Sequence, residues 1–100
     1  QDNMFTFETL VGVNNKGIQV LMRTVEPDML MVALKGASPE TQARFFDNMS
    51  ERARGMFRDD MEAKGPQRMS DVEEAQKKIM RMARQLSDSG ELVLGGGDYV

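Results

Sequence analysis

The chain has 100 residues, of which 40% are hydrophobic and 29% are charged, and its formal net charge is −3 at pH 7. This length and balance are typical of one soluble globular domain with a modest core. The sequence contains no Cys and no His, which excludes a disulfide framework, a zinc ligand set and catalysis by thiolate or imidazole. The acidic balance argues against nucleic acid as a partner, and we expect no cofactor and no metal.

No apolar run approaches the ~20 residues that a membrane-spanning helix needs, and no signal-peptide pattern opens the chain. Because the chain begins with the polar residues Gln-Asp-Asn, we expect a fragment of a longer protein. Its ten methionines suit either core filling or an adaptable binding groove. The core interpretation is favoured because six of them fall within or beside predicted helices: Met29, Met56, Met61, Met69, Met80 and Met82.

Helix signals dominate the first half of the chain. A short leading helix is predicted over residues 5–10, and Asn14 is a candidate N-cap for the next helix. That helix carries apolar residues at helical spacing until Pro27: Ile18, Leu21, Met22 and Val25. A further helix begins at Pro27 and closes with Gly36 as a C-cap, and its apolar middle, residues 29–34, predicts a place at the centre of the core.

The next two helices follow each other almost without a loop. Ser38 as N-cap and Pro39 open the first, which is predicted to present Ala43, Phe46 and Met49 on one side. The second runs from Ser50 to Lys64, and Gly65 with Pro66 ends it. Its predicted apolar stripe consists of Ala53, Met56, Phe57 and Met61.

The last helix has the clearest pattern. Ser70 and Glu73 form a candidate capping box at its start, and Gly90 ends it. Its apolar seam consists of Val72, Ala75, Ile79, Met82 and Leu86, and the ELVLGGG segment that follows is interpreted as a tail. The pattern as a whole predicts an all-α fold, a compact bundle of about six short helices after a linker or hinge segment.

Two charges on the helix from Ser50 to Lys64 lack a local partner. At about 100° per residue, Arg52 and Asp59 lie on nearly the same stripe two turns apart, and neither has an opposite charge one turn away. Each is therefore free to meet a charge elsewhere, although a charged helix face is most often simply solvated. Four other pairs at helical spacing are predicted to form locally: Asp60 with Lys64, Arg58 with Glu62, Glu73 with Lys77 and Glu74 with Lys78.

Several motifs occur in an order that is not generic for helices: MFTF at 4–7, LVGVNNKGIQVLMRTV, LKGA at 34–37, NMSERA at 48–53, RDDMEAKGPQRMSDVEEAQKKI and a glycine-rich end. Across residues 4–97 they resemble the carboxy-terminal six-helix subdomain of the flagellar motor switch protein FliG family. The resemblance implies a hinge or linker at 1–7, a helical torque domain at 8–94 and a flexible glycine-rich tail at 95–100. Arg54, Gly55 and Gln67 depart from the family's usual residues.

The resemblance also implies a rotor component of the bacterial flagellum, which generates torque and takes part in switching the direction of rotation. Its implied partners are the cytoplasmic loop of the stator protein MotA or its sodium-driven counterpart, neighbouring FliG subunits, and FliM and FliF through other parts of the full-length protein. The implied location is the switch complex of the basal body, at the cytoplasmic face of the inner membrane. Carried over by motif, the stator-facing residues are Lys35, Arg52, Asp59, Asp60 and Arg68, and the hinge residues are Met4, Phe5 and Phe7.

Two other function classes have to be considered. A non-catalytic helical adaptor that binds a partner helix through a Met-rich surface is the alternative. Catalysis is not expected, because the adjacent carboxylates of Asp59 and Asp60 point about 100° apart on a helix and no nucleophile with a base accompanies them.

Overall fold

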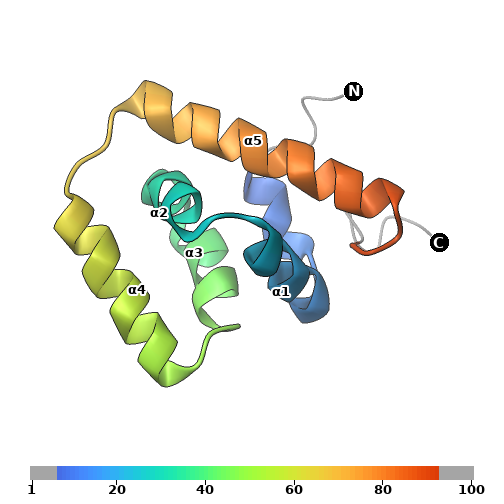
Figure 1. Cartoon of the computed structure of the whole chain (residues 1–100), viewed down its shortest axis with the longest axis horizontal. Helices are drawn as coiled ribbons and strands as arrows, with labels where there is room; N and C mark the ends of the chain where they lie inside the picture. The colour runs from blue at the N-terminus through green and yellow to red at the C-terminus, as the bar shows by residue number, and fades with distance from the viewer. Residues whose placement is uncertain (1–6, 93–100) are drawn as a thin grey trace.

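The computed structural model describes residues 7–92, which form one 3-10 helix and five α-helices without a strand (Figure 1). In chain order these are η2 (Phe7–Gly12), α1 (Asn15–Thr24), α2 (Pro27–Lys35), α3 (Pro39–Phe46), α4 (Glu51–Lys64) and α5 (Met69–Asp88). The predicted all-α bundle is confirmed. The predicted leading helix over 5–10 is found as a 3-10 helix that begins at Phe7, and the tail at 95–100 lies outside the described residues.

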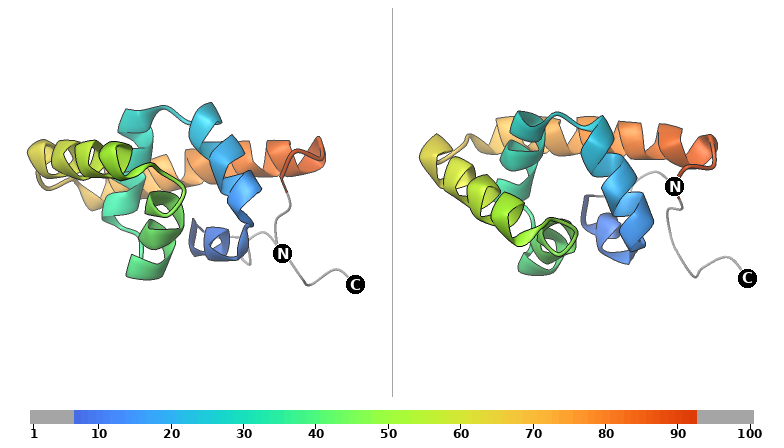
Figure 2. Two further views of the ribbon diagram at one scale, coloured as in Figure 1. Left: turned by 90° about the horizontal axis from the view of Figure 1, so that it is seen from below. Right: turned by 60° about the horizontal axis from the view of Figure 1, so that its bottom comes forward.

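Helix α5 runs along one edge of the molecule, and α2 makes its most extensive contacts with it (Figure 1). Helices α2 and α3 lie between α4 at one end and α1 with η2 at the other, as both views in Figure 2 show. Among residues 7–92 no helix is both long and apolar enough to cross a membrane.

The core is built from the apolar sides of η2, α1, α2, α3 and α5. Its largest fully buried side chains are Phe45, Leu10, Ile18, Leu21, Leu34, Ile79, Val13 and Thr41. The ring of Phe7 stacks on that of Phe45 at 6.1 Å between centroids. Four residues of α2 are buried, namely Leu30, Met31, Ala33 and Leu34, which confirms the prediction that this helix is central.

A carboxylate joins the first described element to α3. The side chain of Glu8 accepts hydrogen bonds from the Ser38 hydroxyl, from the Ser38 backbone N–H at 3.1 Å and from the Thr41 hydroxyl at 2.7 Å. Burial acts to raise the pKa of Glu8, but these hydrogen bonds outweigh it and hold the pKa below its ordinary value. Glu8 therefore reinforces the N-terminus of α3, where a negative charge is favourable.

Two of the predicted N-caps are confirmed: the side chain of Asn14 accepts from Gly17 N and that of Ser38 from Thr41 N. Ser50, which was predicted only as the start of a helix, is also an N-cap, because its side chain accepts from Ala53 N. The capping box at Ser70 is wrong: α5 starts at Met69, after Arg68 with extended backbone. A cap residue needs non-helical backbone, and Ser70 is already inside the first turn.

The predicted buried side of α3 was wrong at one position. Ala43 is exposed, whereas Thr41 and Phe45 are buried together with Phe46. Met49 lies beyond the end of the helix and is half-buried against the core. The helix has only 8 residues, too few for its apolar spacing to distinguish a face centred on Phe45 from one centred on Ala43.

The methionines divide between the core and the surface. Met80 is buried, and Met29, Met61 and Met82 are half-buried against the core cluster. Met56 and Met69 are 59% and 71% exposed, so the core interpretation holds for four of these six and is wrong for two. At the other end of the described chain Leu92, expected in a tail, is buried at 3% exposure.

Helices α2 and α5 approach each other closely at Gly36. Its φ of −102° is not left-handed, so the predicted C-cap position is correct but the αL conformation is not what requires glycine. A Cβ at Gly36 would lie 2.5 Å from Cγ1 of Val72, a buried residue of α5. Nearby, the Gln76 side-chain amide donates to the Ala33 carbonyl at 2.9 Å, which ties the same two helices together.

We expect Gly36→Ala to lower the free energy of unfolding by about 1–3 kcal/mol, the usual effect of overpacking a filled site. Gly55→Ala is the control, because Gly55 sits inside α4 and a Cβ added there would meet nothing within 4 Å. That change should stabilise by up to ~1 kcal/mol through helix propensity. Urea denaturation measures both, and equal effects at the two glycines would contradict the packing explanation.

Candidate interaction site on helix α4

Helix α4 has 14 residues and well-defined ends. Ser50 accepts from Ala53 N at 3.1 Å, and Gly65, at a φ of 73°, ends the helix. Positive φ is readily adopted by glycine and costs other residues energy. Figure 2 shows the helix at one end of the molecule, away from α1 and η2.

None of the residues of α4 is buried. Phe57 and Met61 are half-buried against the core cluster, in agreement with the predicted stripe. Ala53 and Met56 are exposed, so the prediction was wrong for them. The physical reason is that only one narrow edge of the helix contacts the rest of the molecule. Phe57 and Met61 lie on that edge, whereas Ala53 and Met56 lie outside it.

One residue of α3, Phe46, holds the middle of α4. The ring of Phe57 meets that of Phe46 edge-on at 5.9 Å between centroids, and the guanidinium carbon of Arg58 lies 4.9 Å from the Phe46 ring centroid. Arg54 Nε donates to the Phe46 carbonyl at 3.1 Å. Contacts of these kinds each contribute on the order of 1 kcal/mol, so α4 is held by a few local contacts rather than by extensive burial.

The same contacts explain how Arg54, which departs from the family's usual residue, is accommodated at this position. Its guanidinium also donates to the Met49 carbonyl at 3.4 Å. The carbonyls at the end of a helix lack partners within the helix, and Arg54 reaches two carbonyls at the end of α3 and in the turn after it. Helical spacing could not predict these hydrogen bonds, because the donor lies on α4 and the acceptors lie at the end of α3 and in the turn after it.

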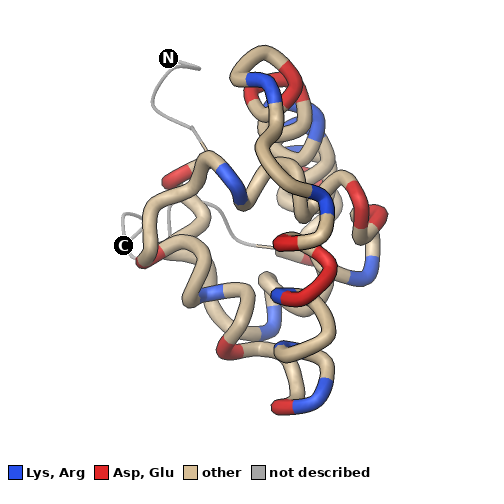
Figure 3. Tube along the Cα trace, turned by 90° about the vertical axis from the view of Figure 1, so that its left-hand side faces the viewer, with Lys and Arg blue, Asp and Glu red and all other residues tan. Residues whose placement is uncertain are grey.

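Arg52 and Asp59 are both exposed, and their side chains form no hydrogen bond or ion pair with any residue in the range 7–92. This agrees with the expectation that neither has a partner within its own helix. Figure 3 views the molecule from the end where α4 lies, and basic and acidic residues are interspersed there rather than separated into two patches. Both charges are therefore available to another molecule.

The four ion pairs predicted from helical spacing, all of them within the described range, do not form. Lys64 Nζ lies 4.0 Å from the carboxylate of Asp28 on α2 instead of pairing with Asp60, and Arg58 lies over the Phe46 ring instead of pairing with Glu62. Glu73 and Glu74 are likewise unpaired with Lys77 and Lys78. Exposed ion pairs within a helix contribute little free energy. The long side chains of Lys64 and Arg58 therefore contact residues of other helices instead.

The remaining predicted site residues are spread over neighbouring elements. Asp60 is exposed on α4, and Arg68 is exposed immediately before α5. Lys35 is half-buried at the end of α2, and no described side-chain contact joins it to the other four. The structure thus gathers Arg52, Asp59 and Asp60 on one helix, with Arg68 close behind it in the chain and Lys35 on another helix.

Of the predicted hinge residues, Met4 and Phe5 lie outside the described residues. Phe7 is 3% exposed and stacks on Phe45, so it is fixed in the core. Among residues 7–92 no group of three or more His, Cys, Asp or Glu residues is placed to hold a metal ion.

A small all-helical domain that projects a charged helix, held by a few local contacts and with two charges that have no partner among residues 7–92, has the features of a protein-interaction module. Residues 1–94 match the FliG C-terminal domain family, and the chain belongs to that family. It is 53% identical over 97 residues to the flagellar motor switch protein FliG of Vibrio cholerae and 50% identical over 96 residues to that of Pseudomonas aeruginosa.

Those alignments cover 97% and 96% of this chain but 28% of each relative, so the chain spans little more than a quarter of their length. Among solved structures, FliG residues 116–343 from H. pylori superimposes with a TM-score of 0.88 at 33% identity, over 92% of this chain and 40% of that one. Full-length FliG from Aquifex aeolicus gives a TM-score of 0.85 at 37% identity, over 89% and 28%. The fold and the family are therefore established together.

We expect Phe46→Leu to loosen α4 selectively. The change removes the ring that Phe57 and Arg58 contact, so amide hydrogen exchange in α4 should accelerate roughly tenfold, which corresponds to about 1.4 kcal/mol of lost local stability. Phe45→Leu is the control, since Phe45 stacks on Phe7 in the central core and its change should accelerate exchange in all helices. Unchanged exchange in α4 of the Phe46 variant would show that Phe46 does not anchor it.

Proposed function

We propose that this chain is the part of a flagellar motor switch protein that meets the stator, and that α4 presents the charges on which the stator acts. The observation that supports the proposal is that Arg52 and Asp59 are exposed, lie on nearly one stripe and form no ion pair with the described residues. Family membership supplies the setting, because the named relatives are flagellar motor switch proteins.

A torque-transmitting contact must be directional and must also break at every step. Exposed charge pairs contribute only about 0.2–1 kcal/mol each, whereas an ion that crosses the membrane releases about 2.3 kcal/mol per 100 mV. A few such pairs can therefore form and separate within the free energy of one ion. Their attraction also acts over about 8 Å in physiological salt, which guides the approach of the next stator loop.

In this proposal Arg52 and Asp59 meet the cytoplasmic loop of MotA or of its sodium-driven counterpart directly. Asp60, Arg68 and Lys35 shape the surrounding field. FliM and FliF contact other parts of the full-length protein, and neighbouring FliG subunits are further partners. The assembly lies in the switch complex at the cytoplasmic face of the inner membrane. The role of the domain is therefore rotation and its reversal, and it performs no catalysis.

Charge reversal should test the direct contacts. With Arg52→Glu or Asp59→Arg in the full-length protein, an attraction becomes a repulsion of similar size. The equilibrium of each stator pair should then weaken roughly 2- to 30-fold, and torque measured from the rotation of a tethered bead should fall. A matching reversal on the stator loop should restore part of the torque.

Lys77→Glu is the matched control, because Lys77 is also exposed but lies on α5. It should leave torque unchanged. All three variants should keep the free energy of unfolding within about 0.5 kcal/mol of the parent. If the double reversals with the stator behave as the sum of the single ones, Arg52 and Asp59 do not pair with the stator.

The exposed Met56 and Met69 favour a second candidate, a helical adaptor that binds a partner helix through methionines. Salt distinguishes the two functions, since it screens exposed charge pairs and leaves apolar contacts intact. Stator binding that persists in high salt and is lost in Met56→Ser with Met69→Ser would support the adaptor. Binding that is lost in high salt and in Arg52→Glu would support the charged contact.

We also propose that the domain reorients about the segment before Phe7 when rotation reverses. The motif MFTF resembles the hinge of the family, and the buried, stacked Phe7 gives such a pivot a fixed end on the domain. Met4 and Phe5 are then the residues that move relative to the helices.

Crosslinking should test the pivot. The chain has no cysteine, so a thiol crosslinker can join Phe5→Cys to Val11→Cys, on the exposed side of η2, in a cysteine-free full-length protein. We expect cells that rotate their flagella in one direction and no longer reverse. Val11→Cys alone, treated with the same reagent, should reverse normally. Normal reversal of the crosslinked protein would reject the hinge.

A further inference from the structure

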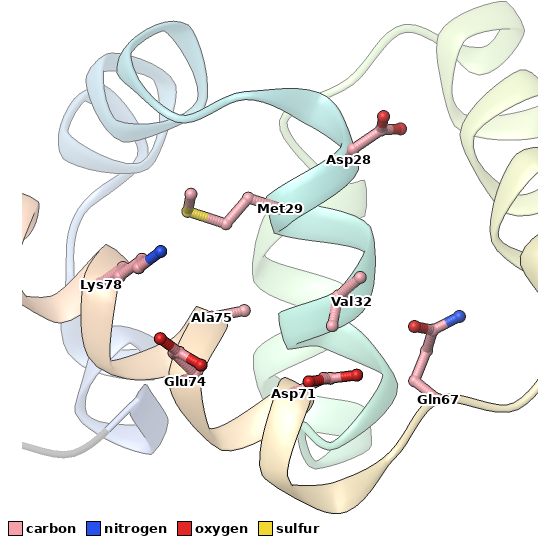
Figure 4. Close-up of a pocket in the computed structure, with 8 residues that line it drawn as sticks. All are labelled: Asp28, Met29, Val32, Gln67, Asp71, Glu74, Ala75 and Lys78. Carbon is pink, nitrogen blue, oxygen red and sulfur yellow. The ribbon is translucent and has the colours of Figure 1, made fainter.

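A groove between α2 and α5 is not explained by the stator contact. It is an open hollow of about 330 Å³ lined by Asp28, Met29, Val32, Gln67, Asp71, Glu74, Ala75 and Lys78. In Figure 4, Met29 and Val32 on α2 lie beside Ala75 on α5, and the charged residues surround them. The volume is at the lower end of the range for ligand sites, which suits one or two side chains of a docked segment.

The rim of this groove has a net negative charge. Asp28, Asp71 and Glu74 contribute three carboxylates against the one ammonium group of Lys78. Glu74 and Lys78 form no ion pair, although they are four residues apart on α5. An apolar floor inside an acidic rim is complementary to an apolar side chain flanked by basic residues.

Two residues of the groove also hold the end of α4. Asp28 forms the ion pair with Lys64, the last residue of α4, but the pair is long at 4.0 Å and the Asp28 side chain is 82% exposed. Gln67 donates to the carbonyls of Lys64 and Gly65, both at 3.4 Å. A basic group that binds in the groove would compete with Lys64 for Asp28.

We propose that this groove docks a segment of a partner protein that carries an apolar side chain flanked by Lys or Arg, and that docking releases the end of α4 from α2. The proposal is independent of the stator contact, since Arg52 and Asp59 do not line the groove. In this proposal α2 and α5 form a second binding surface. A partner bound there weakens the contact between Asp28 on α2 and Lys64 at the end of α4.

The probe is a short fluorescein-labelled helical peptide with leucines on one face and lysines beside them, and its binding to the 100-residue chain is followed by fluorescence anisotropy. We expect saturable binding, lost when glutamates replace the lysines or alanines replace the leucines. Glu74→Lys should weaken binding roughly tenfold, because an attraction becomes a repulsion. Glu73→Lys, the adjacent exposed residue outside the groove, should leave affinity within about twofold.

Equal weakening by the two reversals, or binding that ignores the leucines, would show non-specific charge attraction and overturn the proposal. So would self-association of the chain in sedimentation measurements that Glu74→Lys abolishes, since the occupant would then be a second copy. For the release of α4, Lys64→Gln should bind the peptide more tightly than Lys16→Gln, which makes the same change in net charge on α1. Equal affinity of these two variants would refute the coupling.

Discussion

The packing of α2 against α5 is the constraint on which the rest of this domain depends. Helix α2 contributes four buried residues to the core, and it reaches α5 closely only because Gly36 has no Cβ to meet Val72. The Gln76 amide on the Ala33 carbonyl fixes the same contact. With α2 in place, Asp28 at its start lies beside Lys64 at the end of α4, and this adds to the contacts that Phe46 of α3 makes with the middle of that helix.

The weak attachment of α4 is a consequence of its composition. A helix that carries charges on most of its circumference has little apolar area to bury, and burial is what usually holds a helix in a small domain. Phe46 supplies several attachment contacts instead: its ring contacts Phe57 and the Arg58 guanidinium, and its carbonyl accepts a hydrogen bond from Arg54. The arrangement leaves most side chains of the helix in solvent.

The features that sequence predicted well are those decided within a few residues. The caps at Asn14 and Ser38 depend on a side chain and an N–H three residues away, and both were found. Phe45 was missed because α3 is too short for spacing to fix its buried side, and Ser70 was misassigned because the helix start depends on the backbone of Arg68. The partners of Arg58 and Lys64 could not be predicted, because Phe46 and Asp28 belong to other helices and spacing reports only neighbours on the same one.

Arg52 and Asp59 could be selected as candidates from the sequence, because neither has an opposite charge one turn away on its own helix. A residue without an opposite charge one turn away can still find a partner across the fold, as Lys64 does with Asp28. Arg52 and Asp59 do not find one among the described residues, because their stripe faces away from the edge of α4 that carries Phe57 and Met61. The same separation explains why Arg54 and Arg58, on the inner side, are used for attachment. The side chains that attach the helix and the two exposed charges without a partner are thus on two different sides of α4, so a change on the attached side need not alter those charges.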